Sequence, residues 1–142
     1  YLTPLAVPAM RGANLFCRAA LVMAPRKKLD PAVKAGLLAP YNNWHNRVAV
    51  VKFVQDIAIK PADPSYPMGR FLDDNLHQLN DLPMLICWGI HDFVFDRSYL
   101  AEWRRRFPEA ACQEFESAGH YLLEDEPEAV GARIEKFLHE TD

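Results

Sequence analysis

A short apolar run between Pro83 and Gly89, with the sequence PMLICWG, limits the fold of this chain more than any other stretch. An uninterrupted apolar run of this length, bounded by Pro and Gly, is typical of a strand that is buried on both faces of a parallel sheet. Parallel strands are joined by helical crossovers, and suitable segments follow in the sequence. We expect a helix over 97–107, a weaker strand over 111–117 and a helix over 125–140. Residues 81–142 therefore predict a β-α-β-α order, the end of an α/β domain.

Residues 1–80 predict helices broken by prolines. We expect helices over 11–24, 31–38, 42–58 and roughly 68–80, and a proline-rich loop over 60–67. Asp30 before Pro31 has the pattern of an N-cap followed by Pro at the first helical position. The β-branched valines of 42–58 also suit a strand, and that alternative stays open. The apolar residues expected to face inward on the helices of the chain include Val50, Val51, Val54, Ile57, Phe71, Leu72, Leu100, Trp103, Phe107, Val130, Ile134, Phe137 and Leu138.

Composition and charge restrict the class of protein. The chain has 142 residues, half of them apolar and a quarter charged, which is a globular composition. Its net charge of −3 does not favour binding to nucleic acid or anionic lipid, and we interpret Arg104–Arg106 as a solvated helix face. Three scattered cysteines without a CxxC pattern predict reduced thiols and a cytoplasmic location. No apolar run reaches the roughly 18 residues of a membrane span, and no secretory leader is visible.

An acid and a histidine follow the two predicted strands. Asp92 lies in the loop after Gly89, within GIHD, and His120 directly follows Gly119, within SAGHY. Reactive groups in open α/β sheets collect beyond the carboxyl ends of the strands, so these two side chains are expected to meet. A carboxylate facing an imidazole fixes its tautomer and stabilises the imidazolium that forms when the ring takes a proton.

Each of the two residues also has a structural interpretation. A histidine is more often packed or exposed than catalytic, and an Asp after a strand is commonly a turn former. The joint placement favours a functional pair. The remaining histidines, which are His45, His77, His91 and His139, lack such a setting and are expected to have no role.

The stretches LICWGIHDFVF and AGHYLLEDEPEAV resemble the C-terminal half of an α/β-hydrolase, in the haloalkane dehalogenase and epoxide hydrolase branch. The stretch LLAPYNNWHNRVAVVKFVQDI resembles the cap of haloalkane dehalogenase-like enzymes, particularly those related to the β-lactone decarboxylases of olefin biosynthesis. The resemblance implies that Asp92 is the acid and His120 the base of a nucleophile–His–acid triad, in the chain order of that fold. It implies that residues 1–80 form a helical cap over the site and that 81–142 belong to the hydrolase core.

The resemblance also implies an aromatic substrate pocket. The candidate lining residues are Phe16, Trp44, Phe93, Phe95 and Tyr121. Packing in the core is an equally good interpretation of each of them.

The nucleophile that such enzymes carry on a sharp turn is not found in this sequence. None of the six glycines lies four positions from another, so a G-x-S-x-G pattern is absent, and Cys87 lies inside the apolar strand rather than on a turn. The chain also begins at Tyr1 rather than Met. We therefore expect a C-terminal part of a hydrolase, whose partner is the N-terminal half bearing the nucleophile, or a second copy of the chain.

The chemistry depends on that missing group. With an aspartate nucleophile, the substrate would be a small apolar haloalkane, epoxide or β-lactone, attacked to form an ester that His120 and water hydrolyse. With a serine nucleophile, esterase or lactonase chemistry is expected, and a non-catalytic binding module is the third possibility. No metal site and no phosphate-binding loop is recognisable, so no cofactor is predicted.

Overall fold

A computed structural model describes residues 5–141, and its contacts divide the chain into two units. The first unit comprises residues through Leu21 together with Asp30–Gln78, and the second comprises Val22–Leu29 together with the residues from Leu79 onward. The elements in chain order are α1 (Ala6–Gly12), α2 (Leu15–Met23), α3 (Pro31–Leu38), η1 (Ala39–Tyr41), α4 (Val48–Gln55), α5 (Tyr66–Asn75), η2 (Leu76–Leu79), β1 (Leu85–Gly89), α6 (Arg97–Arg106), β2 (Ala111–Phe115), α7 (Leu122–Asp125) and α8 (Pro127–Thr141).

The helices of the first unit pack around a small core. Met10 of α1 lies against Val50 and Val51 of α4, and all three side chains are buried. At the start of α3, Asp30 accepts a hydrogen bond from the N–H of Ala32 at 2.7 Å, as its sequence pattern predicts. The interpretation of residues 1–80 as a substrate cap stays a prediction.

The helix expected over 11–24 is wrong in its extent, because the chain breaks at Asn14. Asn14 has a φ of 53°, in the left-handed region, and separates α1 from α2. Its amide donates a hydrogen bond to the Tyr41 carbonyl at 3.2 Å. Asparagine is one of the few residues other than Gly that adopts this conformation readily, so the break falls where its backbone cost is low.

The segment expected as a helix over 42–58 is helical only from Val48 to Gln55. Val50 and Val51 are buried, as the pattern predicts, and the alternative strand is absent from this described segment. Ile57 lies beyond the helix and is 47% exposed, so its assignment to the buried face is wrong. The predicted helix after the proline-rich loop begins two residues early, at Tyr66, and ends in the 3-10 turn η2.

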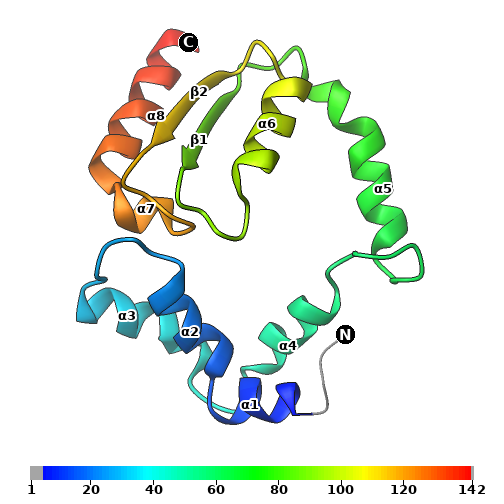
Figure 1. Ribbon diagram of the computed structural model, residues 1–142, viewed down its shortest axis with the longest axis vertical. Helices are drawn as coiled ribbons and strands as arrows, with labels where there is room; N and C mark the ends of the chain where they lie inside the picture. Colours follow the sequence, from blue (N-terminus) through cyan, green and yellow to red (C-terminus); the bar gives the residue numbers. More distant parts are fainter. Residues whose placement is uncertain (1–4, 142) are drawn as a thin grey trace. The chain divides into compact units, whose positions relative to one another are not determined.

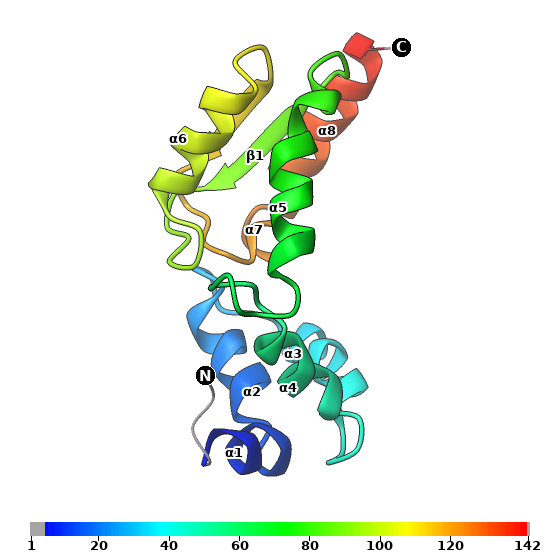
Figure 2. The ribbon, with the colours of Figure 1, turned by 90° about the vertical axis from the view of Figure 1, so that its right-hand side faces the viewer.

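The second unit contains the predicted β-α-β-α order, interrupted only by the short helix α7 (Figure 1). Strands β1 and β2 are parallel, with Leu85 opposite Ala111 and Gly89 opposite Phe115. Figure 2 shows β1 between α6 on one face and α8 on the other. On the α8 face, Val130 packs with Phe115 and Ala118, and Cys87 lies against this cluster. A right-handed crossover through a helix is the usual way to join two such strands.

Several apolar side chains that were expected to face a core are exposed in the structure. Phe71 and Leu72 of α5 are 60% and 57% exposed, and Ile134 and Leu138 of α8 are 41% and 54% exposed. Their helical spacing predicted the helices correctly, but the partner surfaces they would need are not among the residues described. Within residues 5–141, no helix is long and apolar enough to cross a membrane.

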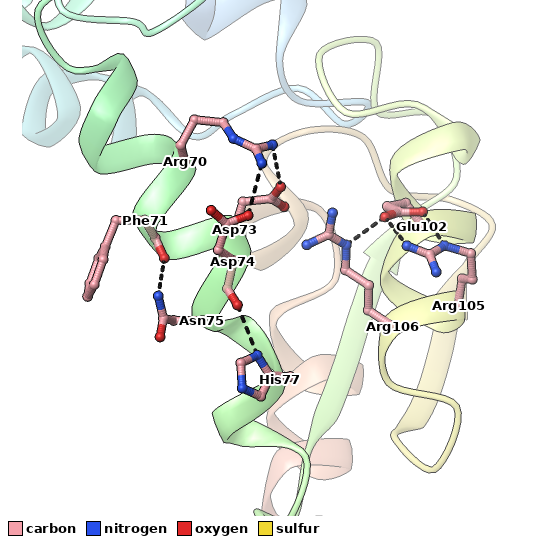
Figure 3. Close-up of polar contacts among 9 residues, drawn as sticks. All are labelled: Arg70, Phe71, Asp73, Asp74, Asn75, His77, Glu102, Arg105 and Arg106. Carbon is pink, nitrogen blue, oxygen red and sulfur yellow. Dashed lines mark hydrogen bonds and ion pairs between the residues drawn. The ribbon is translucent and has the colours of Figure 1, made fainter.

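The arginines at the end of α6 form ion pairs on an exposed helix face, in agreement with the sequence interpretation. Arg105 and Arg106 both pair with Glu102, at 2.7 and 2.6 Å, as Figure 3 shows. These hydrogen bonds lower the pKa of Glu102 to about 2. Arg104 pairs instead with Glu114 of β2, at 2.7 Å.

Candidate active site

The carboxyl ends of β1 and β2 lie at the same edge of the sheet and carry the two candidate residues (Figure 1). His120 Nδ1 lies 2.9 Å from Asp92 Oδ2. The imidazole is 30% exposed and the carboxylate 11%. The two residues are 28 positions apart in sequence, so only the parallel pairing of the strands brings them together.

The Asp92 side chain is oriented by its own loop. Its Oδ1 accepts hydrogen bonds from the backbone N–H groups of Val94 and Phe95, at 2.8 and 2.9 Å. This Asx-type turn uses one carboxylate oxygen for the backbone and leaves Oδ2 for His120. Because Oδ2 is an acceptor, the geometry favours the proton on Nδ1 and a lone pair on Nε2. Among residues 5–141, the structure gives Nε2 no hydrogen-bond partner.

The two loops are in direct backbone contact. The N–H of His91 donates to the Ala118 carbonyl at 2.9 Å, and the N–H of Ile90 donates to the Phe115 carbonyl at 3.2 Å. A Cβ placed on Gly89 would lie only 2.3 Å from the Gly119 carbonyl oxygen. Glycine at 89 is therefore required for this close approach, which positions Asp92 beside His120.

A buried carboxylate beneath the histidine was not predicted as part of the site. Asp125 is 1% exposed and accepts a hydrogen bond from the N–H of Gly119 at 2.8 Å. It also accepts from the N–H groups of Arg26 and Lys27, both at 2.8 Å to Oδ1. In the sequence, Asp125 is only the first residue of the helix expected over 125–140, and the Arg26 and Lys27 donors lie almost a hundred residues away.

Three of the five aromatic candidates lie in the second unit. The ring of Phe95 is 5.5 Å from that of His120, and the ring of Tyr121 is 6.1 Å from it. The backbone of Phe95 is also fixed, because its carbonyl accepts a hydrogen bond from Trp88 Nε1 at 3.2 Å. Phe93 is 56% exposed on the same loop as Asp92. The rings of Phe95 and Tyr121 therefore lie beside the imidazole, and we call these two residues the aromatic wall.

The other two aromatic candidates, Phe16 and Trp44, belong to the first unit. Trp44 lies under the Arg11 guanidinium, 4.4 Å from the ring centroid, and its carbonyl accepts two hydrogen bonds from the same group. Phe16 is 45% exposed on α2. A substrate-binding role for either residue stays a prediction.

The histidines without a predicted role have different surroundings. The ring of His77 contacts the Asp74 carbonyl rather than a carboxylate, as Figure 3 shows, and His91 is exposed. Within the described residues, no group of three or more His, Cys, Asp or Glu side chains could hold a metal ion. The three cysteines are unpaired, and burial raises the pKa of the Cys17 and Cys87 thiols.

Known proteins match this chain over nearly its full length. It is 38% identical over 141 residues to the cis-3-alkyl-4-alkyloxetan-2-one decarboxylase of Shewanella oneidensis, which covers 99% of this chain and 44% of that protein. It is 36% identical to the protein of the same name from Xanthomonas campestris, covering 91% of this chain and 43% of the relative. Among solved structures, haloalkane dehalogenase DbeA of Bradyrhizobium elkani matches with a TM-score of 0.84 at 21% identity, over 99% of this chain and 48% of that one.

This chain has the C-terminal part of an α/β-hydrolase fold. A second dehalogenase, DatA of Agrobacterium tumefaciens, matches with a TM-score of 0.82 at 16% identity, over 99% of this chain and 48% of its own. No family model matches the sequence. The chain spans less than half the length of the two decarboxylases it matches. The predicted resemblance to the dehalogenase-like branch and to β-lactone decarboxylases is confirmed.

Proposed function

We propose that this chain supplies the base and the acid of a nucleophile–His–acid triad in an enzyme that acts on a β-lactone. The observation that carries the proposal is the 2.9 Å hydrogen bond between His120 Nδ1 and Asp92 Oδ2 at the ends of adjacent parallel strands. Asp92 holds the imidazole with Nε2 open to a proton, and it stabilises the imidazolium that forms when Nε2 takes one.

The nucleophile comes from residues outside this sequence. The 142 residues contain no G-x-S-x-G pattern, and the curated relatives are more than twice as long as the part they share with this chain. In α/β-hydrolases the nucleophile precedes the acid and the histidine in chain order. A complete enzyme therefore combines this chain with a polypeptide segment that bears an aspartate or a serine on a sharp turn.

A β-lactone is favoured over a haloalkane or an epoxide by the names of the relatives. The two relatives that match more than 90% of this chain are named for an oxetan-2-one, a four-membered lactone, and are 38% and 36% identical to it. Epoxide hydrolase 1 of Caenorhabditis elegans is 32% identical but matches only 42% of this chain. The dehalogenases match at 16–21% identity, which supports the fold rather than the substrate. The aromatic wall formed by Phe95 and Tyr121 suits alkyl substituents, because burying apolar groups against apolar ring faces is favourable in water.

An aspartate nucleophile would open the lactone by substitution. One carboxylate oxygen attacks the saturated ring carbon bonded to the ring oxygen, and the bond between that carbon and the ring oxygen breaks. The lactone carbonyl group becomes a free carboxylate, and the new ester bond joins the opened substrate to the enzyme. For hydrolysis, His120 Nε2 takes a proton from water as the hydroxide adds to the ester carbonyl carbon. The departing alcohol then takes the proton back, and the product is a β-hydroxy acid.

A second outcome from the same ester is decarboxylation, which the relatives' names favour. The electron pair of the bond to the free carboxylate forms a carbon–carbon double bond while the ester carbon–oxygen bond breaks. Carbon dioxide and an alkene leave, and the enzyme carboxylate is regenerated without water. The two outcomes differ in their products, so product analysis separates them.

The decisive experiment uses His120→Ala in a complete protein that contains this chain, with a cis-dialkyl β-lactone as substrate. If a water step consumes an aspartyl ester, turnover stops and intact mass spectrometry finds the protein heavier by one lactone. A serine nucleophile predicts lost turnover without an adduct, because the serine itself needs His120 as its base. His91→Ala is the matched control, since this exposed neighbour of Asp92 is expected to leave turnover unchanged.

Other results have distinct meanings. Alkene release from the wild-type protein would assign decarboxylation. Wild-type turnover in His120→Ala would overturn the proposal, because no step would then need His120 as its base. If the wild-type protein gives no product and no adduct, the non-catalytic binding module is favoured.

A further inference from the structure

The most fully buried charged side chain of the described residues has no place in the proposed triad. Asp125 is 1% exposed, and its carboxylate makes four short contacts with three backbone N–H groups. The N–H of Arg26 lies 2.8 Å from Oδ1 and 3.0 Å from Oδ2, and that of Lys27 lies 2.8 Å from Oδ1. The N–H of Gly119 lies 2.8 Å from Oδ2. Every partner is a donor, so both carboxylate oxygens act as acceptors throughout.

These contacts join two segments that are far apart in sequence. Gly119 directly precedes His120. Arg26 and Lys27 lie in Val22–Leu29, a segment of the second unit that is preceded and followed in sequence by residues of the first unit. The backbone of the two segments also meets without Asp125, since the N–H of Tyr121 donates to the Ala24 carbonyl at 3.2 Å. His120 is therefore fixed on both sides, at Gly119 and at Tyr121.

The fit between the segments leaves no space for adjustment. A Cβ on Gly119 would lie 2.8 Å from the Ala24 carbonyl oxygen and 3.1 Å from Cγ of Arg26. Gly119 and Ala118 are both buried. A loop packed this closely transmits a displacement of its supporting carboxylate to the residue it carries.

We propose that Asp125 is a positioning residue, which holds the Gly119–His120 loop against Val22–Leu29 and so fixes His120 within hydrogen-bond distance of Asp92. This inference rests on the proposed role of His120 as a base. Asp125 touches neither Asp92 nor the imidazole, and it acts only through the backbone of Gly119. The segment that leads into and out of the first unit is thereby attached directly to the histidine loop.

The test compares Asp125→Asn with Glu126→Gln in a complete protein that contains this chain. Both changes remove one carboxylate from adjacent positions, but Glu126 pairs with the Lys27 side chain at 2.7 Å and binds no loop backbone. The Asn amide presents one acceptor, and its N–H₂ group would face N–H donors. We expect kcat to fall by roughly 10- to 100-fold in Asp125→Asn, with KM unchanged, because the histidine is misplaced while the substrate pocket remains.

Two further readouts separate positioning from simple destabilisation. The NMR resonance of the His120 Nδ1 proton, which the Asp92 hydrogen bond shifts downfield, should move or disappear in Asp125→Asn at a temperature where the protein is folded. With an aspartate nucleophile and a water step, the variant should also accumulate the adduct expected of His120→Ala. Glu126→Gln should retain the wild-type resonance and turnover.

The outcomes distinguish this inference from the proposed function. If His120→Ala abolishes turnover but Asp125→Asn retains the wild-type kcat and Nδ1 resonance, the positioning role is refuted and the triad stands. If His120→Ala leaves turnover intact, the proposed function is refuted. The His120 Nδ1 resonance in Asp125→Asn then decides by itself whether Asp125 positions the imidazole.

If Asp125→Asn does not fold, a semisynthetic protein with an ester oxygen in place of the Gly119 N–H removes a single hydrogen bond. A wild-type Nδ1 resonance and wild-type kcat in that protein would overturn the inference. A shifted resonance and a lowered kcat would support it.

Discussion

Gly89→Ala tests whether the close approach of the two loops sets the geometry of the histidine. A Cβ at position 89 would lie 2.3 Å from the Gly119 carbonyl oxygen and 2.9 Å from that of Ala118, whereas ordinary contacts begin at 3.4 Å. Both oxygens are backbone atoms, so no side chain can rotate away to make room. The Gly119 peptide must therefore move by about 1 Å relative to β1, and His120 is the next residue.

The change is expected to lower activity and stability by comparable free energies. A displacement of about 1 Å in a catalytic group can lower the rate by roughly 100-fold, and overpacking of this kind destabilises a fold by about 1–3 kcal/mol. We expect kcat/KM of the complete protein to fall by about 100-fold under conditions where urea titration shows it folded. The resonance of the His120 Nδ1 proton should shift because its distance to Asp92 changes.

Gly131→Ala is the matched control, because the same added methyl group meets no atom within 4 Å. Gly131 lies inside α8, where replacing Gly by Ala should raise the free energy of unfolding by about 0.5–1 kcal/mol without changing turnover. Wild-type turnover and an unchanged Nδ1 resonance in Gly89→Ala would refute the reasoning. The loop spacing would then be adjustable, and Gly89 would not be needed to place the pair.

Two further predictions concern stability and thiol chemistry. Asp30→Ala should lower the free energy of unfolding by about 0.5–2 kcal/mol in urea titration, because it removes the N-cap of α3. The control Asp81→Ala, on an exposed turn, should change it by less than about 0.5 kcal/mol. Equal effects of the two changes would contradict the capping role of Asp30. Burial raises the pKa of the Cys87 thiol, so the native thiol stays neutral where the unfolded thiol begins to ionise, at about pH 8.5. The stability contribution is present below that pH and is lost as the pH rises towards the native pKa, so the free energy of unfolding should fall in Cys87-containing protein but less in Cys87→Ala. Iodoacetamide should also label Cys87 more slowly in the native protein than in urea, and equal labelling rates would contradict the effect of burial.

The sheet and the histidine–acid pair were predictable because local patterns carry them. The apolar run before Gly89 is short and lies between Pro and Gly, which favours a strand over a helix, and a helix pattern lies between it and the second strand. Parallel strands end at one edge, so the residues that follow Gly89 and Gly119 had to be neighbours. This topology brings Asp92 and His120 close together, and the Val94 and Phe95 N–H groups orient Asp92 for the 2.9 Å contact.

The predictions that failed depended on partners that a local pattern does not specify. The spacing of Phe71 and Leu72 indicates one face of α5 correctly, but spacing does not say which surface covers that face. The break at Asn14 had a weak local signal, since an Asn inside a helical pattern tolerates a left-handed conformation. Its hydrogen bond to the Tyr41 carbonyl is a tertiary contact, which determines that the break occurs there.

Asp125 shows why a buried carboxylate next to the candidate site can be missed in the sequence. Acids in a first helical turn commonly lie in solvent and interact with the helix dipole, and that interpretation needs no distant partner. The carboxylate is instead buried, because Arg26 and Lys27 bring two backbone donors to it from the other end of the chain. A buried carboxylate is stable only when such donors surround it. The local sequence around His120 therefore predicts the histidine, whereas the carboxylate that binds its loop is also bound by a segment almost a hundred residues earlier in the chain.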